Sequence, residues 1–298
     1  MDIRTLTSKI LIKATRSLRF MLNDEVFLRI MYRLHMGKRL NLDTPQTMNE
    51  KMQWLKLYDR QPAYQKMVDK LAAKEYYREM IGPEYIIPTI GEWNDVEDID
   101  FDSLPNSFVL KTNHSGGNTG VIVCKDKSKL NVAEAKKRLK KSLKSDIYNW
   151  YGEWPYKGIN KRIFAEELIG KEGEELVDYK FYCFDGYVDA VLICVDRQIG
   201  DPKFYFFDKN WELKRYNKRG KMAPEGFTLP KPENIDKMFE LASVISNGIP
   251  HLRVDLYNVD GKIYFGESTF FTCSGFDANR LPEADLYFGS LIKLPAEK

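Results

Sequence analysis

The stretch that decides the fold is residues 108–123, which read FVLKTNHSGGNTGVIV. An apolar run ends in Lys111, passes through a loop of small residues and glycines, and returns to an apolar run, which is the pattern of a β-hairpin. Glycine lets the backbone approach an oxyanion closely, successive backbone N–H groups can form an anion-binding nest, and the lysine adds a point charge. The GxxxxGK[ST] pattern of a Walker loop is absent, and no helix follows the glycines directly. The stretch therefore predicts a phosphate-binding loop carried on a hairpin.

Length and composition indicate an ordinary globular protein. The chain has 298 residues, of which 43% are hydrophobic and 30% charged, enough for two or three small domains. Its apolar runs fall far short of the ~20 residues of a membrane span, and its N-terminus lacks the apolar core of a signal peptide. The four cysteines form no CxxC pair and there are only three histidines, which argues against a zinc site. We therefore expect a cytoplasmic protein with reduced thiols.

Positive charge is concentrated near the N-terminus. Residues 1–40 hold nine Lys and Arg against three Asp and Glu, a net charge of +6 in a chain whose total is +3. An apolar stripe at helical spacing runs through this segment: Leu6, Ile10, Leu11, Ala14 and Leu18. Such a helix either packs on its own domain by its apolar face or lies on an anionic membrane surface or a partner. A nucleic-acid role is not expected, because no basic patch with interleaved aromatic residues recurs downstream.

The order of elements predicts an α+β protein, with strands in the middle and helices on the flanks. Helices are expected over residues 1–40 with a break near Gly37, from a Thr47–Glu50 capping box onward, and over residues 64–80, 131–143 and 234–247. Besides the hairpin, strands are expected over residues 162–169, 179–184, 187–195, 203–207, 251–258 and 262–271. Residues 148–155 are expected to be irregular.

Carboxylates on the last predicted hairpin are candidate metal ligands. Arg253 and Asp255 lie two apart on one strand and therefore share a face. Pairing around the Asp260-Gly261 turn would bring Asp255 and Glu267 onto one surface. Two carboxylates on one pocket suit Mg²⁺, which takes few protein oxygens plus nucleotide phosphates, although acids on a hairpin are more often a solvated face. Residues 166–169, Glu-Glu-Leu-Ile, are a second candidate: a strand end that presents backbone groups to an adenine and an acid to a ribose, or merely an exposed pair.

In this order, the segments resemble the ATP-grasp superfamily, and more narrowly its TupA-like branch, which is associated with teichuronopeptide and capsular polysaccharide clusters. The resemblance covers about residues 49–295 and rests on residues 108–118, 154–156 (Trp-Pro-Tyr), 178–181 (Asp-Tyr-Lys-Phe), 253–257 (Arg-Val-Asp-Leu-Tyr) and 266–270 (Gly-Glu-Ser-Thr-Phe). It implies an N-terminal basic helical region over residues 1–60 and an ATP-grasp domain over 61–298. That domain would consist of a nucleotide-lid subdomain near 105–165 and a metal-binding subdomain near 166–290.

The resemblance implies ATP and Mg²⁺ as cofactors, with roles for the matching residues. The phosphates would be contacted by Lys111 and covered by a loop that includes Ser115, Gly116, Gly117 and Asn118. The adenine hinge would be Glu166, Glu167, Leu168 and Ile169. A further basic contact would come from Lys74, with Lys70 competing for that role, and Lys180 would lie near the nucleotide. Mg²⁺ would be held by Asp255 and Glu267, with Thr269 standing where many relatives have Asn. Arg253 and Lys180 would be catalytic, Arg253 by stabilising charge on the transferred phosphoryl group.

The reaction that the resemblance implies is carboxylate–amine ligation through an acyl phosphate, with an amide formed on a uronic acid or other carboxylate of a cell-surface polysaccharide or its precursor. Arginines that could bind a substrate carboxylate are Arg197, Arg219 and Arg280. The basic N-terminal helix fits an enzyme that works peripherally at the inner face of the membrane. The sequence names neither substrate nor an oligomeric state.

Three other functions stay open. A glycosyltransferase would need a sugar-nucleotide site, and the Asp-Ile-Asp at 98–100 lies in an acidic loop with no apolar strand before it. A phosphotransferase would share the ATP site and differ only in its products. A non-enzymatic glycan-assembly adaptor would be favoured if Lys111, Asp255 and Glu267 did not converge. Cys273 is expected to be a structural thiol, since no histidine is near it in sequence, and His114 either touches the phosphates or packs the loop.

Overall fold

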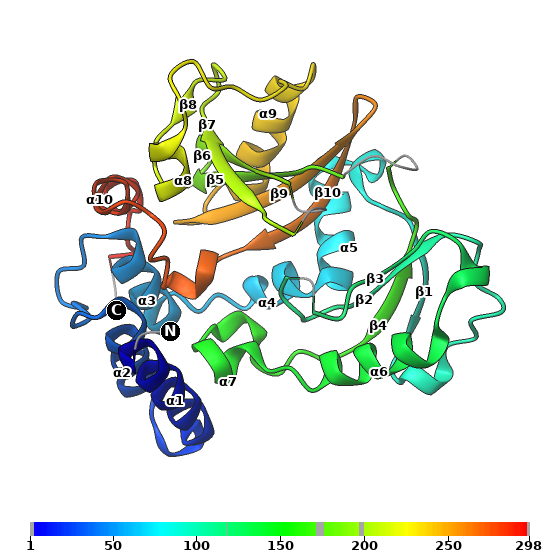
Figure 1. Cartoon of the computed structure of the whole chain (residues 1–298), viewed down its shortest axis with the longest axis horizontal. Helices are drawn as coiled ribbons and strands as arrows, with labels where there is room; N and C mark the ends of the chain where they lie inside the picture. Colours follow the sequence, from blue (N-terminus) through cyan, green and yellow to red (C-terminus); the bar gives the residue numbers. More distant parts are fainter. Residues whose placement is uncertain (1–2, 118, 171–175, 197–199, 297–298) are drawn as a thin grey trace.

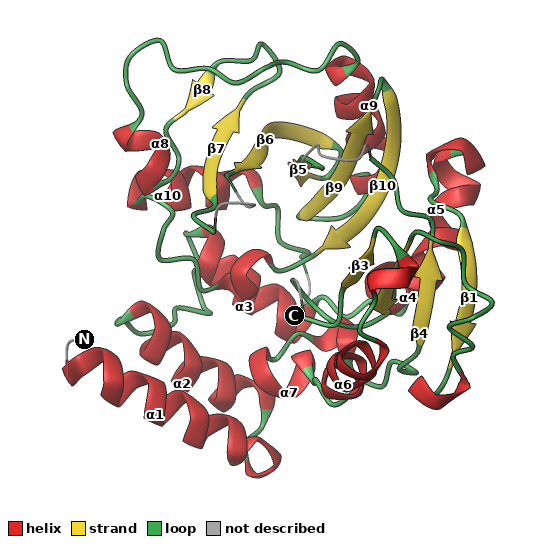
Figure 2. Ribbon diagram, turned by 45° about the vertical axis from the view of Figure 1, so that its right-hand side comes forward, coloured by secondary structure: helices red, strands yellow, loops and turns green. Residues whose placement is uncertain are grey.

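The protein consists of two antiparallel sheets flanked by helices, with a helical hairpin projecting from the body at the N-terminus (Figures 1 and 2). The computed structural model describes residues 3–117, 119–170, 176–196 and 200–296. The predicted α+β class is confirmed. None of the helices in these ranges is long and apolar enough to span a bilayer.

The smaller sheet has four strands and carries the lysine hairpin. Its order is β1 (Thr89–Trp93), β4 (Ile163–Glu166), β2 (Phe108–Thr112) and β3 (Ile122–Cys124), all antiparallel. Alternate residues such as Phe108 and Leu110 are fully buried, and they belong to one core with Leu139 of helix α6 (Val132–Leu143). The predicted hairpin is confirmed, because β2 pairs directly with β3.

The larger sheet has six strands and carries the predicted metal hairpin. Its order is β10 (Lys262–Thr269), β9 (Leu252–Val259), β5 (Asp178–Phe184), β6 (Tyr187–Val195), β7 (Lys203–Phe207) and β8 (Leu213–Lys214). Helix α9 (Ile235–Ser246) packs on it, with Phe181 and Phe239 in edge-to-face contact at 5.1 Å. A bulge between Phe265 and Glu267 sets Glu267 directly opposite Asp255.

Helices connect the two sheets and pack the N-terminal part of the chain onto the larger one. The Thr47–Glu50 capping box of α3 (Met48–Tyr58) is confirmed, and α3 packs on α10 (Pro282–Leu291), where Asn49 donates to Asp285 at 3.0 Å. Helices α4 (Ala63–Val68) and α5 (Lys70–Ile81) follow, and α5 contacts α9. The remaining short elements are η2 (Pro83–Tyr85), η3 (Val96–Asp98), η4 (Lys127–Lys129), α7 (Ile147–Tyr151), η5 (Trp154–Tyr156), α8 (Lys218–Met222) and η6 (Thr272–Gly275). The predicted domain boundaries stay predictions.

Several predicted helix and strand limits were wrong. The first helix already ends at α1 (Ile3–Ser17), and η1 (Arg19–Met21) precedes α2 (Asp24–Met36), whose N-cap is Asn23. The helix expected over 64–80 is interrupted at Asp69, whose carboxylate accepts from the first N–H groups of α5. Part of the segment expected to be irregular forms α7. Strand β4 stops at Glu166 because its neighbour β1 begins only after Pro88, which has no N–H to extend the ladder.

The apolar stripe of α1 does not face the domain. Ile10 is 61% exposed, Leu11 47% and Leu18 49%, whereas Ile12, which lies off the stripe, packs against the core. The interpretation in which the stripe packs on the protein's own domain is therefore wrong for these side chains. The exposed apolar surface continues through Phe20 and Met21 in η1, where the helical hairpin turns (Figure 1).

Candidate functional site

A buried carboxylate at the end of β4 holds two lysines. Glu166 is 3% exposed, and its Oε2 lies 2.7 Å from Nζ of Lys74 on α5. Its Oε1 accepts from Nζ of Lys111 on β2. Burial raises the pKa of Glu166, but Lys111 and Lys74 outweigh burial and hold that pKa below its usual value. Burial also lowers the pKa of Lys74, although the negative charge of Glu166 acts in the opposite direction and raises it. Lys111, the lysine predicted to contact phosphates, thus lies beside the ionised carboxylate of Glu166.

A second charged cluster lies on the larger sheet around Asp255. The guanidinium group of Arg253 binds this carboxylate through two parallel hydrogen bonds: Nε donates to Oδ1 at 2.6 Å and one Nη to Oδ2 at 2.8 Å. Lys180 on β5 lies directly opposite Asp255 in the ladder, and its Nζ is 2.5 Å from Oδ2. Lys180 also lies 3.3 Å from Asp178, two residues earlier on the same face. Alternation along β5 and β9 therefore places these four groups together.

Glu267 extends this cluster toward the glycine-rich loop. Its Oε1 lies 3.2 Å from Arg253, and its Oε2 lies 3.0 Å from Nζ of Lys70 at the start of α5. Burial raises the pKa of Glu267, but Lys70, Arg253 and Lys180 outweigh burial and hold that pKa far below its usual value. At neutral pH Glu166 and Glu267 are therefore ionised, and each is paired with two cations.

Helix α5 connects the two clusters. Lys70 and Lys74 are one turn apart, so Lys70 faces Glu267 while Lys74 faces Glu166. Nζ of Lys70 also donates to the carbonyl of Ser115 in the glycine-rich loop, at 2.9 Å. The sequence presented these lysines as competitors for one role, whereas the structure gives each a separate carboxylate. The predicted residues Lys111, Asp255 and Glu267 are thereby joined by a short chain of contacts.

The base of the glycine-rich loop is anchored and its tip is exposed. Asn113 accepts from the backbone N–H of Lys70 through its carbonyl at 2.9 Å, and its side chain donates to Asp69 at 2.9 Å. Ser115 is buried, while Gly116 and Gly117 are exposed. Asn118, predicted to belong to this loop, lies outside the described residues. The arrangement gives a fixed base beside Lys111 and a tip that projects into solvent.

Asp255 and Glu267 are two protein carboxylates of a kind that suits Mg²⁺, and their role as its ligands stays a prediction. Asp255 and Glu267 face each other across β9 and β10. In the described ranges, no three His, Cys, Asp or Glu side chains gather as a metal site. Mg²⁺ typically uses one or two carboxylates plus phosphate oxygens and water, so two suffice. Thr269 lies two residues after Glu267, on the same face of β10 and half-buried, and its role as a metal neighbour stays a prediction.

The remaining predicted site residues fall into three groups. In the predicted adenine hinge after Glu166, Glu167 is exposed and Leu168 and Ile169 are half-buried, and their adenine contacts stay a prediction. Of the arginines proposed for a substrate carboxylate, Arg280 is buried and paired with Asp285 at 3.1 Å and Asp277 at 3.3 Å, so it already has carboxylate partners within the fold. Arg219 donates to the Tyr205 hydroxyl at 3.2 Å, and Arg197 lies outside the described residues.

Neither His114 nor Cys273 has the surroundings of a catalytic group. The ring of His114 is buried, with its nitrogens 3.3 Å from Asn113 and 3.1 Å from Ser145, and burial lowers its pKa to about 4. His114 is therefore neutral at pH 7 and packs the base of the loop. Cys273 is an exposed residue, yet desolvation of its thiol by the surrounding groups still raises its pKa, which disfavours a nucleophilic thiolate.

A buried lysine that no sequence pattern indicated lies below the turn that follows β10. Lys56 is fully buried, and its Nζ donates to the carbonyls of Ser274 and Tyr151, both at 2.8 Å. The Ser274 hydroxyl donates to the buried Glu153 at 2.5 Å. Cys273 and Ser274 both have left-handed backbones, with φ of 49° and 54°, so this network holds a strained turn in place. The contact of Asp178 with Lys180 was also not predicted. The two residues lie two apart on one strand, and this spacing could have indicated that their side chains share a face.

Comparison with known proteins identifies the family. A family model described as TupA-like ATPgrasp matches residues 50–293. No curated protein matches the chain. Among solved structures, a D-alanine–D-alanine ligase from Helicobacter pylori is 14% identical over 77% of this chain and 61% of its own, with a TM-score of 0.44. The corresponding ligase from Bacillus anthracis in complex with ATP is 16% identical over 76% and 64%, with a TM-score of 0.45.

The chain spans about three fifths of the Helicobacter pylori ligase. The family match covers most of the chain, including both hairpins and all the charged residues of the two clusters. The chain belongs to the TupA-like ATP-grasp family.

Proposed function

We propose that this protein is an ATP- and Mg²⁺-dependent carboxylate–amine ligase. The observation that carries the proposal is the double contact of α5, with Lys74 on Glu166 beside the lysine hairpin and Lys70 on Glu267 beside Asp255. A hairpin with a glycine loop suits a triphosphate, and paired carboxylates suit the metal that accompanies it. The same contacts argue against a non-enzymatic adaptor, which has no need of them.

The arrangement supports phosphoryl transfer followed by amide formation. A carboxylate oxygen of the substrate attacks the γ-phosphorus of ATP, and ADP leaves. The amine nitrogen then attacks the acyl carbon, inorganic phosphate leaves, and the amine loses a proton. When bound by Asp255 and Glu267, Mg²⁺ would offset the charge of the transferred group. Arg253 and Lys180, which both contact Asp255, would stabilise the same charge, and the loop at Gly116 and Gly117 would exclude water from the acyl phosphate.

For the substrates, we propose a carboxylate on an anionic cell-surface glycan or its precursor, joined to an amine. This assignment is supported by the family's association with teichuronopeptide and capsular polysaccharide clusters. Arg219 is the one proposed carboxylate arginine within the described ranges that has no ion pair there. A cytoplasmic location follows from the same proposal, because ATP is a cytoplasmic co-substrate.

For peripheral membrane contact, we propose that the exposed apolar surface of α1 and η1 rests on an anionic bilayer. Phe20 is 84% exposed and Met21 70% at the turn of the projecting hairpin, and Lys9 and Lys13 are exposed on α1. Apolar side chains flanked by lysines are the pattern of an interfacial helix. Phe20→Ser should lose co-sedimentation with vesicles of anionic phospholipid while it keeps ADP binding. Unchanged sedimentation would contradict this contact.

Nucleotide binding and ADP release test the ligase proposal. Calorimetry should show Mg²⁺-dependent ATP binding that is lost in Lys111→Ala, and ADP release with a panel of uronic acids and amines should be lost in Glu267→Gln. The exposed Lys209→Ala serves as the control. Mass spectrometry of the product separates amide formation from phosphorylation alone. Binding of a sugar nucleotide without binding of ATP would overturn the proposal in favour of a glycosyltransferase.

A further inference from the structure

The part of the chain around the lysine hairpin is strongly basic. Residues 105–165 contain thirteen Lys and Arg against four Asp and Glu, a net charge of +9, whereas the whole chain carries +3. The two charged clusters of the site account for little of this excess, because only Lys111 of these thirteen belongs to them. The excess positive charge therefore lies elsewhere on this part of the surface.

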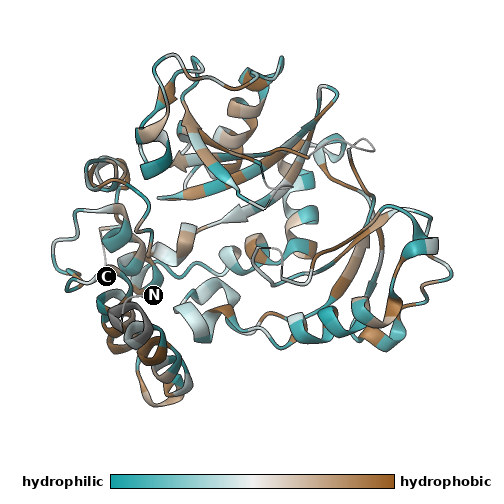
Figure 3. Ribbon diagram, in the orientation of Figure 1, coloured by the Kyte–Doolittle hydropathy of each residue, from teal (hydrophilic) through white to brown (hydrophobic). Residues whose placement is uncertain are grey.

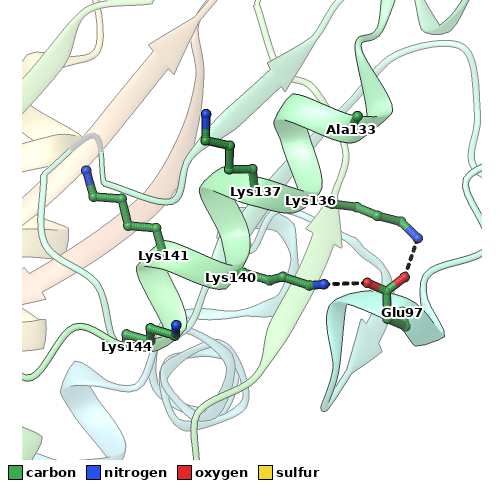
Figure 4. Close-up of a pocket in the computed structure, with 7 residues that line it drawn as sticks. All are labelled: Glu97, Ala133, Lys136, Lys137, Lys140, Lys141 and Lys144. Carbon is green, nitrogen blue, oxygen red and sulfur yellow. Dashed lines mark hydrogen bonds and ion pairs between the residues drawn. The ribbon is translucent and has the colours of Figure 1, made fainter.

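Much of it lies on one side of α6, which we call the lysine face: Lys136, Lys137, Lys140, Lys141 and Lys144. With Glu97 and Ala133 these residues line a shallow depression of about 480 Å³ (Figure 4). Glu97 pairs with Lys136 at 2.7 Å and with Lys140 at 2.6 Å. Lys137 and Lys141 point away from Glu97 (Figure 4). The face is thus divided into a partly neutralised half, where Lys136 and Lys140 share one carboxylate, and a half with a larger excess of charge.

The three lysines of the second half have little neutralisation. Lys137 lies 3.6 Å from Glu134 at a mostly exposed site, where an ion pair is weak. Lys141 and Lys144 are exposed and form no ion pair with any residue in the described ranges. Lys144 caps the helix seven residues after Lys137, and a helix rises about 10 Å over that spacing. This spacing suits several charges carried along a chain better than a single carboxylate.

The lysine face adjoins the glycine-rich loop. Arg138 donates to the carbonyl of Val121 at 2.9 Å, and the hydroxyls of Ser142 and Thr112 are 2.6 Å apart. Gly120 lies so close to Ser142 that a Cβ atom there would be 2.1 Å from the serine hydroxyl. Helix α6 and the end of the loop are therefore packed tightly together, and a ligand lying along α6 would lie beside the loop.

The chemistry of the lysine face selects one kind of partner. No aromatic side chain lines the depression, so the stacking that single-stranded nucleic acids require is absent from that lining. Ala133 is its only apolar member, and α6 is mostly hydrophilic in Figure 3, unlike the apolar surface of α1 and η1. An interfacial helix needs apolar side chains to insert, so a bilayer is a poor fit. A water-soluble polyanion is the partner that matches.

We propose that the lysine face binds a polyanionic glycan chain, a polyuronate, and holds it beside the glycine-rich loop so that one of its carboxylates reaches the site. The acceptor would then be a polymer and not a free sugar acid. The delivery step rests on the proposed ligase function, whereas binding of the polymer to α6 does not and is measured without turnover.

Binding of polygalacturonate to the full chain tests this surface. Fluorescence anisotropy at low ionic strength should show binding that weakens as salt is added, while monomeric galacturonic acid should not compete at matched uronate concentration. The triple variant Lys137→Gln, Lys141→Gln, Lys144→Gln should bind the polymer about tenfold more weakly. The control removes the same charge from exposed lysines of the larger-sheet side: Lys209→Gln, Lys221→Gln and Lys231→Gln. It should bind within about twofold of the unchanged chain.

The outcomes separate the two proposals. Equal polymer affinity in the triple variant, or tighter binding of single-stranded DNA or anionic vesicles than of the polymer to this face, overturns the surface assignment. ADP affinity should be unchanged in the triple variant, which shows that its fold and nucleotide site are intact. Polymer binding that depends on the three lysines, in a protein that releases no ADP with any acceptor, would support the surface while refuting the ligase.

Discussion

Replacing Glu166 by Gln should destabilise the protein strongly. The change is nearly isosteric, but it leaves the ammonium groups of Lys74 and Lys111 without their carboxylate, and the two lysine side chains are only 10% and 17% exposed. Removing one partner of a buried ion pair typically costs about 3–5 kcal/mol. Since both lysines retain some access to water, we expect about 3 kcal/mol at pH 7. Urea unfolding followed by circular dichroism measures this cost.

A matched control is Glu92→Gln. Glu92 pairs with Arg162 at 2.9 Å, but its side chain is 53% exposed, so this pair should contribute below about 1 kcal/mol. ADP with Mg²⁺ should restore part of the lost stability in Glu166→Gln, because a phosphate would supply Lys111 with a new counter-charge. Equal unfolding midpoints for the two variants would refute the reasoning, since burial would then make no difference to the cost of losing a carboxylate.

Three further predictions concern acid stability and the loop. Burial lowers the pKa of His114 from 6.5 to about 4. The unfolded chain then binds the proton more readily, so stability is complete above pH ~6.5 and is lost as the pH falls toward 4. Between pH 7 and pH 5 the loss should be about 2 kcal/mol, and urea midpoints should show a smaller difference in His114→Gln. Gly120→Ala should lower the melting temperature and weaken ADP binding, because φ is +75° and the Cβ would meet Ser142. Gly117→Ala, with φ of +60° and open space, should cost only about 1 kcal/mol and leave a stable fold in the same melt. Lys111→Met should weaken ATP more than adenosine in calorimetry, and equal losses would contradict a phosphate contact.

Local patterns predicted the hairpins well. The Asp260-Gly261 turn sets the register of β9 and β10, and alternation then places Asp255 and Glu267 together. The bulge before Glu267 was not predicted, although Gly266, an isolated glycine in a strand, is the residue type that favours one. The apolar and glycine pattern around Lys111 likewise predicted the hairpin of β2 and β3. In both cases the two strands are close in sequence, so short-range chemistry decides the pairing.

Contacts between distant segments could not be predicted. The pairing of Glu166 with Lys74 joins residues 92 apart in sequence and depends on how α5 packs against β4. The spacing of Ile10 and Leu11 identified an apolar stripe, yet which side of α1 faces the protein is decided by tertiary packing of Ile12. The sequence likewise gave no indication that Arg280 forms an ion pair with Asp285 inside the fold.

The ion pairs around Asp255 and Glu267 have a consequence for the order in which ligands enter. Each carboxylate already has cations at 2.5–3.2 Å, so a divalent ion arriving alone must displace ammonium or guanidinium groups and leave them without partners. A triphosphate arriving with the ion removes that obstacle, because its oxygens can take over Lys70, Lys180 and Arg253 as the carboxylates turn to the metal. Free Mg²⁺ should therefore bind weakly, and metal and nucleotide should enter as a single complex whose binding is an exchange of partners.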